Sequence, residues 1–314
     1  MKWAIGIDLG GSHVAAAAVN ERGKIKSRHK RELASHDVKY VVSEIAKVVE
    51  KAIEGLGKRI VGIGIGAPGN IDDKTGVVRF SPNFGWSDVP FRRKLEKRLG
   101  RSVRILNDAR CATIGEYLHG TGKGTKEFAL ITIGTGLGGG FVCGGKLMLG
   151  NLMGAGEVGH HTIRPDTGFV CNCGKIGCFE AQASGQGLLR HAMAVAPSFP
   201  YSVLFMTPKE QWGSKMVSRA AAAGDEHGLA AWNRFLVDLS IGVANIVAFT
   251  NPEVIALGGG VGQTDDALLA IPLTKMVDEL TTMVPKGQTT IVRAKLGNDA
   301  GIVGSAMLAM HGLP

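Results

Sequence analysis

Near its start the chain reads Trp3-Ala4-Ile5-Gly6-Ile7-Asp8-Leu9-Gly10-Gly11-Ser12-His13, an apolar run that ends in a glycine turn. Residues 3–8 are typical of a buried strand, Gly10-Gly11 reverses the chain, and residues 13–19 continue as a second strand. The same order of strand, glycine turn, strand and second turn recurs at residues 128–147. We interpret this as an internal duplication, which predicts two similar α/β domains facing across a cleft. The alternative is a chance likeness, because glycine hairpins are common.

Strands and helices alternate after both hairpins. Apolar residues recur at helical spacing from Val38 to Leu56, and Gly57 is suited to end that helix. The other expected strands span residues 60–65, 102–106, 128–133 and 254–257. The other expected helices span residues 107–120, 215–223, 226–249 and 299–311. We expect a smaller N-terminal domain, residues 1–108 closed by the C-terminal segment 299–314, and a larger domain, residues 109–298.

The composition is that of a globular protein with a substantial core. Hydrophobic residues make up 45% of the 314 positions and charged residues 20%, which excludes a disordered tail or a small disulfide scaffold. The net charge of +9 indicates a basic surface, which can also attract anionic substrates such as nucleotides. Three Tyr and four Trp are too few to favour a platform that stacks nucleic-acid bases.

We expect the protein to be cytoplasmic. Its sequence has no run of about 18 apolar residues, as a membrane span would need, and no signal-peptide pattern at its N-terminus. Three of its five cysteines fall within eight residues, unlike the framework of a secreted disulfide protein.

Three glycine-rich turns follow expected strands and are candidate phosphate sites. They are Gly10-Gly11 with Ser12, Gly134–Gly140 with Thr135, and Gly258–Gly260. Backbone N–H groups in such turns bind anions, and none of the three has the spacing of a P-loop or a complete dinucleotide fingerprint.

Asp8 ends an apolar strand, where a carboxylate is costly without a cation or donors. We interpret it as a carboxylate that organises Mg²⁺ beside nucleotide phosphates. The alternative is an aspartate that satisfies the amides of the glycine turn.

Asn107-Asp108 follows an expected strand and opens the next helix. Asp108 can serve there as the helix N-cap. It can equally serve as the base that takes the proton of a hydroxyl attacking a phosphoryl group, a role that Asp has in protein kinases. The helix N-terminus would keep the carboxylate ionised for that purpose. The spacing alone leaves both roles open.

A histidine and three cysteines form a candidate metal site. The ligands would be His160, Cys171, Cys173 and Cys178. Three thiols and one imidazole are a known set for structural zinc, and the alternatives are free thiols or one disulfide, which a cytoplasmic compartment disfavours. The ion would hold Glu157 and Glu180 where they could bind a polyol. The alternative for each is exposure to solvent.

In this order the motifs resemble the ROK family of sugar kinases, repressors and unassigned relatives, above all its bacterial-type glucokinases, over essentially the whole chain. The matching motifs are Asp8-Leu9-Gly10-Gly11, Gly66-Ala67-Pro68-Gly69, Asn83-Phe84-Gly85-Trp86, Asn107-Asp108-Ala109, Gly134–Gly140, Gly156-Glu157-Val158-Gly159-His160, Cys171-x-Cys173-Gly174-x-x-Gly177-Cys178-x-Glu180 and Gly258-Gly259-Gly260.

The resemblance implies the actin-like, ribonuclease H-like ATPase fold and transfer of the γ-phosphoryl of ATP, with Mg²⁺, to a hexose, glucose to glucose 6-phosphate foremost. It implies that Asp108 takes the proton from the attacking hydroxyl. The sugar would be held by Gly69, Asn83, Asn107, Asp108, Glu157, His160 and Glu180. The nucleotide would be held by Asp8, Gly10, Gly11 and Ser12 in one turn, by Gly134, Thr135 and Gly136 in a second, and by Gly259 and Gly260 on the adenosine side.

Two motifs depart from the family pattern. Ser12 and His13 stand where the family has Thr and then Lys or Asn. Serine keeps the hydroxyl, whereas His13 lacks a fixed charge at neutral pH. Arg110 replaces the usual Asn after Asp108-Ala109, and we expect it either to contact phosphate or to point to solvent.

The motifs leave several alternatives open. The sugar could be fructose, mannose, N-acetylglucosamine or N-acetylmannosamine, and polyphosphate could be the donor. The resemblance implies a homodimer, and from the residues we expect no nucleic-acid or membrane partner. A sugar-responsive repressor of the same family would need a DNA-binding segment, which we do not expect because the first core strand begins near residue 3.

Overall fold

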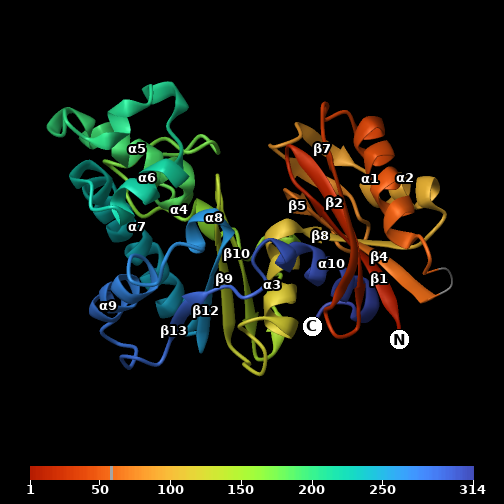
Figure 1. Ribbon diagram of the computed structural model, residues 1–314. Helices are drawn as coiled ribbons and strands as arrows, with labels where there is room; N and C mark the ends of the chain where they lie inside the picture. Colours follow the sequence, from red (N-terminus) through yellow and green to blue (C-terminus); the bar gives the residue numbers. More distant parts are fainter. Residues whose placement is uncertain (57–58) are drawn as a thin grey trace. The chain divides into compact units, whose positions relative to one another are not determined.

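The computed structural model describes residues 1–56 and 59–314, which form two compact units (Figure 1). The first comprises Met1–Lys126, Gly140–Gly156 and Asn298–Pro314, and the second comprises Glu127–Gly139 and Glu157–Gly297. The domain boundary expected after residue 108 stays a prediction, and the first compact unit continues past it. The helix end expected at Gly57 lies outside the described residues.

A five-stranded sheet forms the centre of the first unit, in the order β3-β2-β1-β4-β8. Its strands are β1 (Trp3–Leu9), β2 (His13–Asn20), β3 (Ile25–Glu32), β4 (Ile60–Ala67) and β8 (Val103–Asn107). Strands β1 to β3 form an antiparallel meander, and β4 and β8 extend the sheet parallel to β1. The Gly10 N–H donates to the His13 carbonyl over 2.9 Å, which closes the first glycine turn.

Helices and a small sheet complete this part of the first unit. They are α1 (Val38–Ile53), β5 (Asn70–Ile71), β6 (Val78–Ser81), β7 (Trp86–Val89) and α2 (Phe91–Leu99). Helix α1 begins after Asp37, whose side chain accepts from the N–H groups of Lys39 and Tyr40. The apolar face of α1 is buried in the core. The antiparallel sheet β5-β6-β7 was not expected from the sequence.

The C-terminal helix packs against the first sheet and a neighbouring helix, backbone against backbone. The two helices are α3 (Asp108–His119) and α10 (Ala300–His311). A Cβ on Gly6 of β1 or Gly64 of β4 would overlap a carbonyl oxygen of α10. A Cβ on Gly304 of α10 would overlap the Cys111 carbonyl oxygen of α3. Glycine at these positions therefore permits the close approach that Figure 1 shows for α10.

The second sheet has the order β11-β10-β9-β12-β13. When the strands of each sheet are numbered along the chain, both sheets have the spatial order third, second, first, fourth and fifth. Its strands are β9 (Phe128–Ile133), β10 (Leu137–Cys143), β11 (Lys146–Leu147), β12 (Val254–Gly258) and β13 (Thr290–Arg293). Strands β12 and β9 are parallel, as are β12 and β13. This common topology confirms the duplication, and β10 returns the chain to the first unit at Gly140.

Helices surround the second sheet. They are α4 (Phe179–Ala183), α5 (Gly185–Val195), α6 (Ser214–Ala222), α7 (Glu226–Thr250), α8 (Gly259–Gly262) and α9 (Ala270–Leu280). The helix expected directly after the third glycine turn is the short α8, and α9 follows after a loop. No helix in residues 1–56 or 59–314 is both long and apolar enough to cross a membrane.

We expect Gly304→Ala to lower the free energy of unfolding by about 2 kcal/mol or more, because the added Cβ must separate α10 from α3. Alanine is by itself the better helix former by about 1 kcal/mol, so propensity opposes this loss. Urea unfolding measures it. Gly213→Ala is the control, because a Cβ there meets nothing within 4 Å. Equal stability of both variants would contradict the packing argument.

Candidate functional site

The residues expected to bind substrates are distributed over both units. The first unit contains Asp8, Gly10, Gly11, Ser12, Gly69, Asn83, Asn107 and Asp108. The second contains Gly134, Thr135, Gly136, Glu157, His160, Glu180, Gly259 and Gly260, together with Cys171, Cys173 and Cys178.

Asn107 and Asp108 lie where β8 ends and α3 begins, and they divide two tasks. Asn107 is the N-cap: its Oδ1 accepts from the Arg110 N–H over 3.2 Å. Its amide also donates to the Gly69 carbonyl over 3.3 Å. Asp108 Oδ1 accepts from the Ala109 N–H over 2.8 Å. The alternative that Asp108 caps the helix is therefore wrong. The Asp108 carboxylate lies in the first turn of α3, where the helix dipole favours an anion.

Aromatic packing supports the loop that carries Asn83. The Phe84 and Trp86 rings lie 4.6 Å apart, and the Trp86 indole donates to the His36 carbonyl over 2.8 Å. His36 Nε2 in turn lies 2.7 Å from the Gly11 carbonyl. The chain of contacts fixes the loop between β6 and β7 against the first glycine turn.

Asp8 lies near the end of β1 between Ala15 of β2 and Gly66 of β4. Burial raises the pKa of its carboxyl group, and the charge of Arg28 opposes that rise. The α10 residue Gly301 approaches the Asp8 carboxylate so closely that a Cβ would come within 3.3 Å. Such a carboxylate is suited to a site that supplies a cation.

The two departures from the family pattern have different outcomes. Ser12 Oγ and His13 Nδ1 lie 3.1 Å apart. Burial lowers the pKa of His13, with Lys30 and Arg28 acting in the same direction, which favours the neutral imidazole. Arg110 is buried with 1% of its surface exposed, and its guanidinium donates to the Ala155 carbonyl. The alternative that Arg110 points to solvent is therefore wrong. One group that its guanidinium contacts is the carbonyl of a loop residue.

In the second unit, Glu180 connects the glycine turn to the cysteines. Glu180 Oε2 accepts from the Leu137 N–H over 2.9 Å, and Oε1 lies 3.8 Å from the Cys171 sulfur. A Cβ on Gly136 would come within 2.5 Å of Glu180 Oε2. The alternative of a solvent-exposed Glu180 is therefore wrong, and the sequence gave no sign of its contact with the turn.

The other glycines of this unit lie at the carboxyl ends of parallel strands β9 and β12. The Gly134 carbonyl accepts from the N–H of Gly185 at the start of α5, over 2.8 Å. Gly259 has a φ of 76°, and a Cβ there would come within 2.5 Å of the Ile133 carbonyl oxygen. Both turns expose backbone at the edge where parallel sheets bind ligands.

The histidine and three cysteines come together as a candidate metal centre. One ligand atom from each of the four lies within 4.8 Å of all the others. Cys171 Sγ is 3.7 Å from His160 Nδ1, and Cys173 Sγ is 3.6 Å from Cys178 Sγ. The edges of a tetrahedron around zinc with such ligands are about 3.7 Å long, so the residues fit a closed zinc site.

The protonation of the thiols bears on metal binding. Burial raises the pKa of Cys178 to about 12, whereas a hydrogen bond from the Lys175 backbone lowers that of Cys173 to about 7. Zinc binds thiolates, so it must displace protons from this cluster and binds more weakly as the pH falls.

Glu157 precedes a single helical turn, Val158–His160, and His160 is the last residue of that turn. The His160 N–H donates to the Glu157 carbonyl over 3.1 Å, and both side chains are exposed. With Nδ1 toward the cysteines, His160 retains Nε2 for a second partner.

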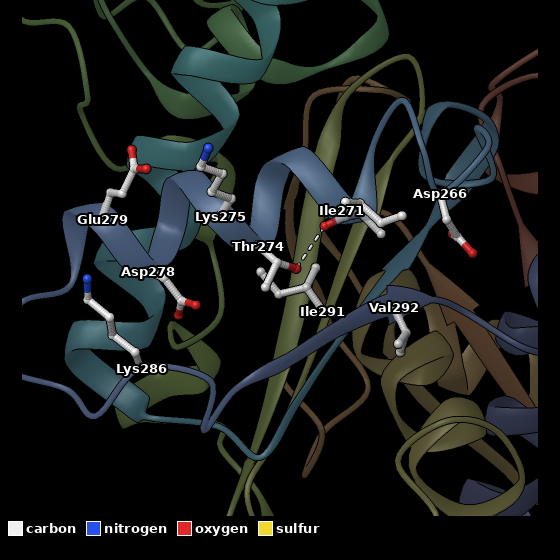
Figure 2. Close-up of a pocket in the computed structure, with 10 residues that line it drawn as sticks. Asp266, Ile271, Thr274, Lys275, Asp278, Glu279, Lys286, Ile291 and Val292 are labelled. Atoms are coloured by element: carbon white, nitrogen blue, oxygen red, sulfur yellow. Dashed lines mark hydrogen bonds between the residues drawn. The ribbon is translucent and has the colours of Figure 1, made fainter.

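A pocket of the second unit lies elsewhere, between α9 and β13 (Figure 2). Figure 2 shows Lys275, Asp278 and Glu279 on α9 and Val292 on β13. None of its lining residues is an expected site residue.

Comparison with known proteins shows the class of protein that these features define. The model of the ROK family matches residues 4–311, and the chain belongs to this family. It has the actin-like ATPase fold of ROK sugar kinases.

Individual relatives match over nearly their whole length. The glucokinase of Halalkalibacterium halodurans is 35% identical over 98% of this chain and 94% of its own. An N-acetyl-D-glucosamine kinase of Vibrio vulnificus is 30% identical over 98% and 99%. The crystal structure of a ROK family glucokinase from Streptomyces griseus, in complex with glucose and AMPPNP, is 35% identical and superposes with a TM-score of 0.87 over 99% of this chain and 100% of that chain.

We expect one zinc ion per chain, measured by elemental analysis, and a lower melting temperature after chelation or acidification, because the ion joins His160 to the loop that carries Cys171, Cys173 and Cys178. Cys173→Ser should lose the ion. Cys143→Ser, a cysteine outside the cluster, should keep it. Full zinc content in Cys173→Ser would contradict the assignment.

Proposed function

We propose that this protein is an ATP-dependent sugar kinase that phosphorylates a hexose, with glucose, converted to glucose 6-phosphate, as the preferred substrate. The observation that carries the proposal is the arrangement at the start of α3. Asn107 caps the helix, so the carboxylate of Asp108, in the first turn, is not needed as the cap. The full-length likeness to glucokinases supports this assignment.

Asp108 acts as the base. It accepts the proton of the attacking hydroxyl, the 6-hydroxyl in the case of glucose, as that oxygen bonds to the γ-phosphorus and the bond to the β-phosphate oxygen breaks. Catalysis here consists of positioning and of stabilising charge on the transferred group. The remaining hexose contacts come from Gly69, Asn83, Asn107, Glu157, His160 and Glu180.

The glycine turns hold the nucleotide. Gly10, Gly11 and Ser12 present N–H and hydroxyl donors to phosphate, as do Gly134, Thr135 and Gly136, and Gly259 and Gly260 line the adenosine side. Asp8 holds Mg²⁺, directly or through water, and the ion, when bound, neutralises phosphate charge.

The bound zinc braces the second unit. When bound, it would hold Cys178 two residues before Glu180, whose Oε2 accepts from the Leu137 N–H beside the Gly134–Gly136 turn, and it would fix His160, a hexose ligand. We further propose that the protein is a cytoplasmic homodimer, which size-exclusion chromatography with light scattering tests.

A second sugar is favoured by one observation, the 30% identity with an N-acetyl-D-glucosamine kinase. Coupled ADP release over a panel of glucose, fructose, mannose, N-acetylglucosamine and N-acetylmannosamine decides between substrates. Direct detection of the sugar phosphate with polyphosphate in place of ATP tests the donor. Absence of phosphorylation with every sugar and both donors would overturn the proposed function.

We expect Asp108→Ala to lower kcat by about a thousandfold or more while hexose binding persists, because the base is lost and the other sugar contacts stay. Steady-state kinetics and calorimetric binding measure the two effects. The matched control is Asp37→Ala, which removes a carboxylate that caps α1. It should cost stability and spare turnover. Substantial activity of Asp108→Ala would remove it as the base.

We expect Asp8→Asn to lower kcat/KM for ATP by about a hundredfold and to stabilise the nucleotide-free protein at neutral pH. The sign follows from burial, which raises the folded-state pKa, so the ionised carboxylate opposes folding. This penalty is absent below the ordinary value of 3.8 and develops as the pH rises through the raised pKa. Thermal unfolding of both proteins at pH 4 and pH 7 measures it. A destabilised Asp8→Asn at pH 7 would contradict the argument.

A further inference from the structure

The loop Gly150–Gly156, which leads directly into Glu157, has a strained backbone. Leu152 and Met153 have φ values of 52° and 61°, in the left-handed region that residues with a side chain rarely adopt. Gly150 and Gly156 also have positive φ. Conformations of this kind persist where surrounding contacts hold them and are common at functional sites.

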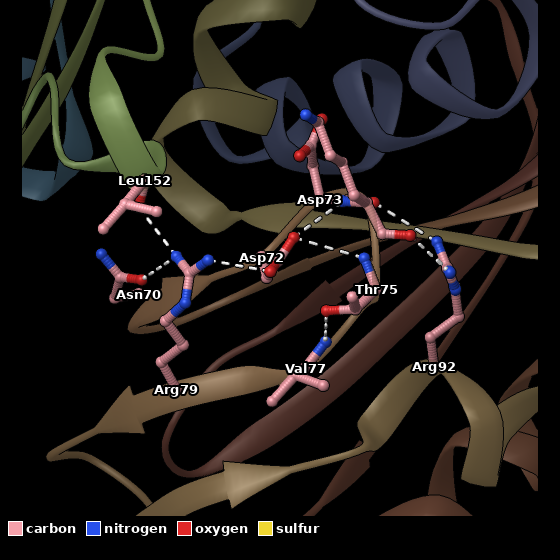
Figure 3. Close-up of polar contacts among 9 residues, drawn as sticks. Asn70, Asp72, Asp73, Thr75, Val77, Arg79, Arg92 and Leu152 are labelled. Atoms are coloured by element: carbon pink, nitrogen blue, oxygen red, sulfur yellow. Dashed lines mark hydrogen bonds and ion pairs between the residues drawn. The ribbon is translucent and has the colours of Figure 1, made fainter.

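One of these contacts comes from Arg79 of β6 (Figure 3). Its Nη1 donates to the Leu152 carbonyl over 2.8 Å, at one of the strained residues, and to Asn70 Oδ1 over 3.2 Å. Its Nη2 pairs with Asp72 Oδ2 over 2.8 Å. The guanidinium is therefore fixed by β5 and by the turn that follows it, and Asn70 itself follows Gly69, a proposed hexose contact.

A second contact comes from Arg110 of α3. The buried guanidinium donates to the carbonyl of Ala155, two residues before Glu157. Arg110 also stands two residues after Asp108. It thus links the helix that carries the proposed base to the chain segment that ends at a proposed hexose ligand.

We propose that Arg79 and Arg110 are positioning residues that hold the Gly150–Gly156 loop in its strained form and thereby present Glu157 to the hexose. This rests on the proposed function. Two guanidinium groups bind carbonyls three residues apart, and hydrogen bonds from a charged donor are about twice as strong as neutral ones. The loop is therefore held from two sides, and the position of Glu157 depends on groups that do not contact the sugar.

The test uses Arg79→Met, since Arg79 is half-exposed whereas a variant of the buried Arg110 can fail to fold. We expect hexose KM to rise about tenfold, with kcat within about twofold and ATP KM unchanged. Arg79→Lys keeps the charge without the fork and should recover part of the loss. The control is Arg98→Met, because the partly exposed Arg98 pairs with Glu50 and contacts neither the loop nor the turn that holds Arg79.

Amide hydrogen exchange gives a readout that needs no substrate. The N–H groups of Gly154 and Ala155 donate within the loop region, to Asn151 and Leu149. Arg79→Met should accelerate exchange over residues 149–157, and Arg98→Met should not. Unchanged exchange in Arg79→Met, or equal hexose KM in both methionine variants, would overturn the proposal. A wild-type protein that phosphorylates no hexose would instead overturn the proposed function, and the exchange result would still decide whether Arg79 holds the loop.

Discussion

Contact between backbones, without side chains between them, is the constraint on which the first unit depends. Helix α10 reaches β1, β4 and α3 because Gly6, Gly64 and Gly304 remove the Cβ atoms that would stand between them. The same approach brings Gly301 beside Asp8 and keeps α3 against the sheet. Asp8, the proposed Mg²⁺ ligand, and Asp108, the proposed base, are therefore positioned by the same packing. Interiors packed this closely shift little, which suits a site that works by positioning.

In the second unit, polar and sulfur contacts connect the glycine turn to the cysteine cluster. Glu180 joins the Leu137 amide to Cys171, and Cys171 lies beside His160. A metal ion at this centre would hold His160, a proposed hexose ligand, and Cys178, two residues before Glu180, and it would take no part in the transfer. The second unit also contains close glycine packing, for example where Gly259 approaches the Ile133 carbonyl, and it adds this polar network to that packing.

Much of this was predictable because the signals are local. The glycine turns, the cysteine spacing and the long apolar runs predicted both meanders, the metal cluster and most helices. The sheet β5-β6-β7 was missed because its strands have two to four residues, too short for a recognisable alternation. The burial of Arg110 and the contact of Glu180 with the glycine turn depend on residues about 45 positions away, which no local pattern reports. Likewise, Asn107 and Asp108 are both residue types that cap helices, and the sequence did not show that Asn107 is the cap.

The division of the first unit into three stretches of sequence has a consequence for synthesis on the ribosome. Strands β1 and β4 and helix α3 emerge early, but α10, the helix that covers them, begins only at Ala300. All residues of the second unit precede that helix, so a growing chain can complete the second unit while the first sheet still lacks its cover. During that interval we expect the unfinished first unit to aggregate more readily than the complete chain, because α10 does not yet pack on β1 and β4.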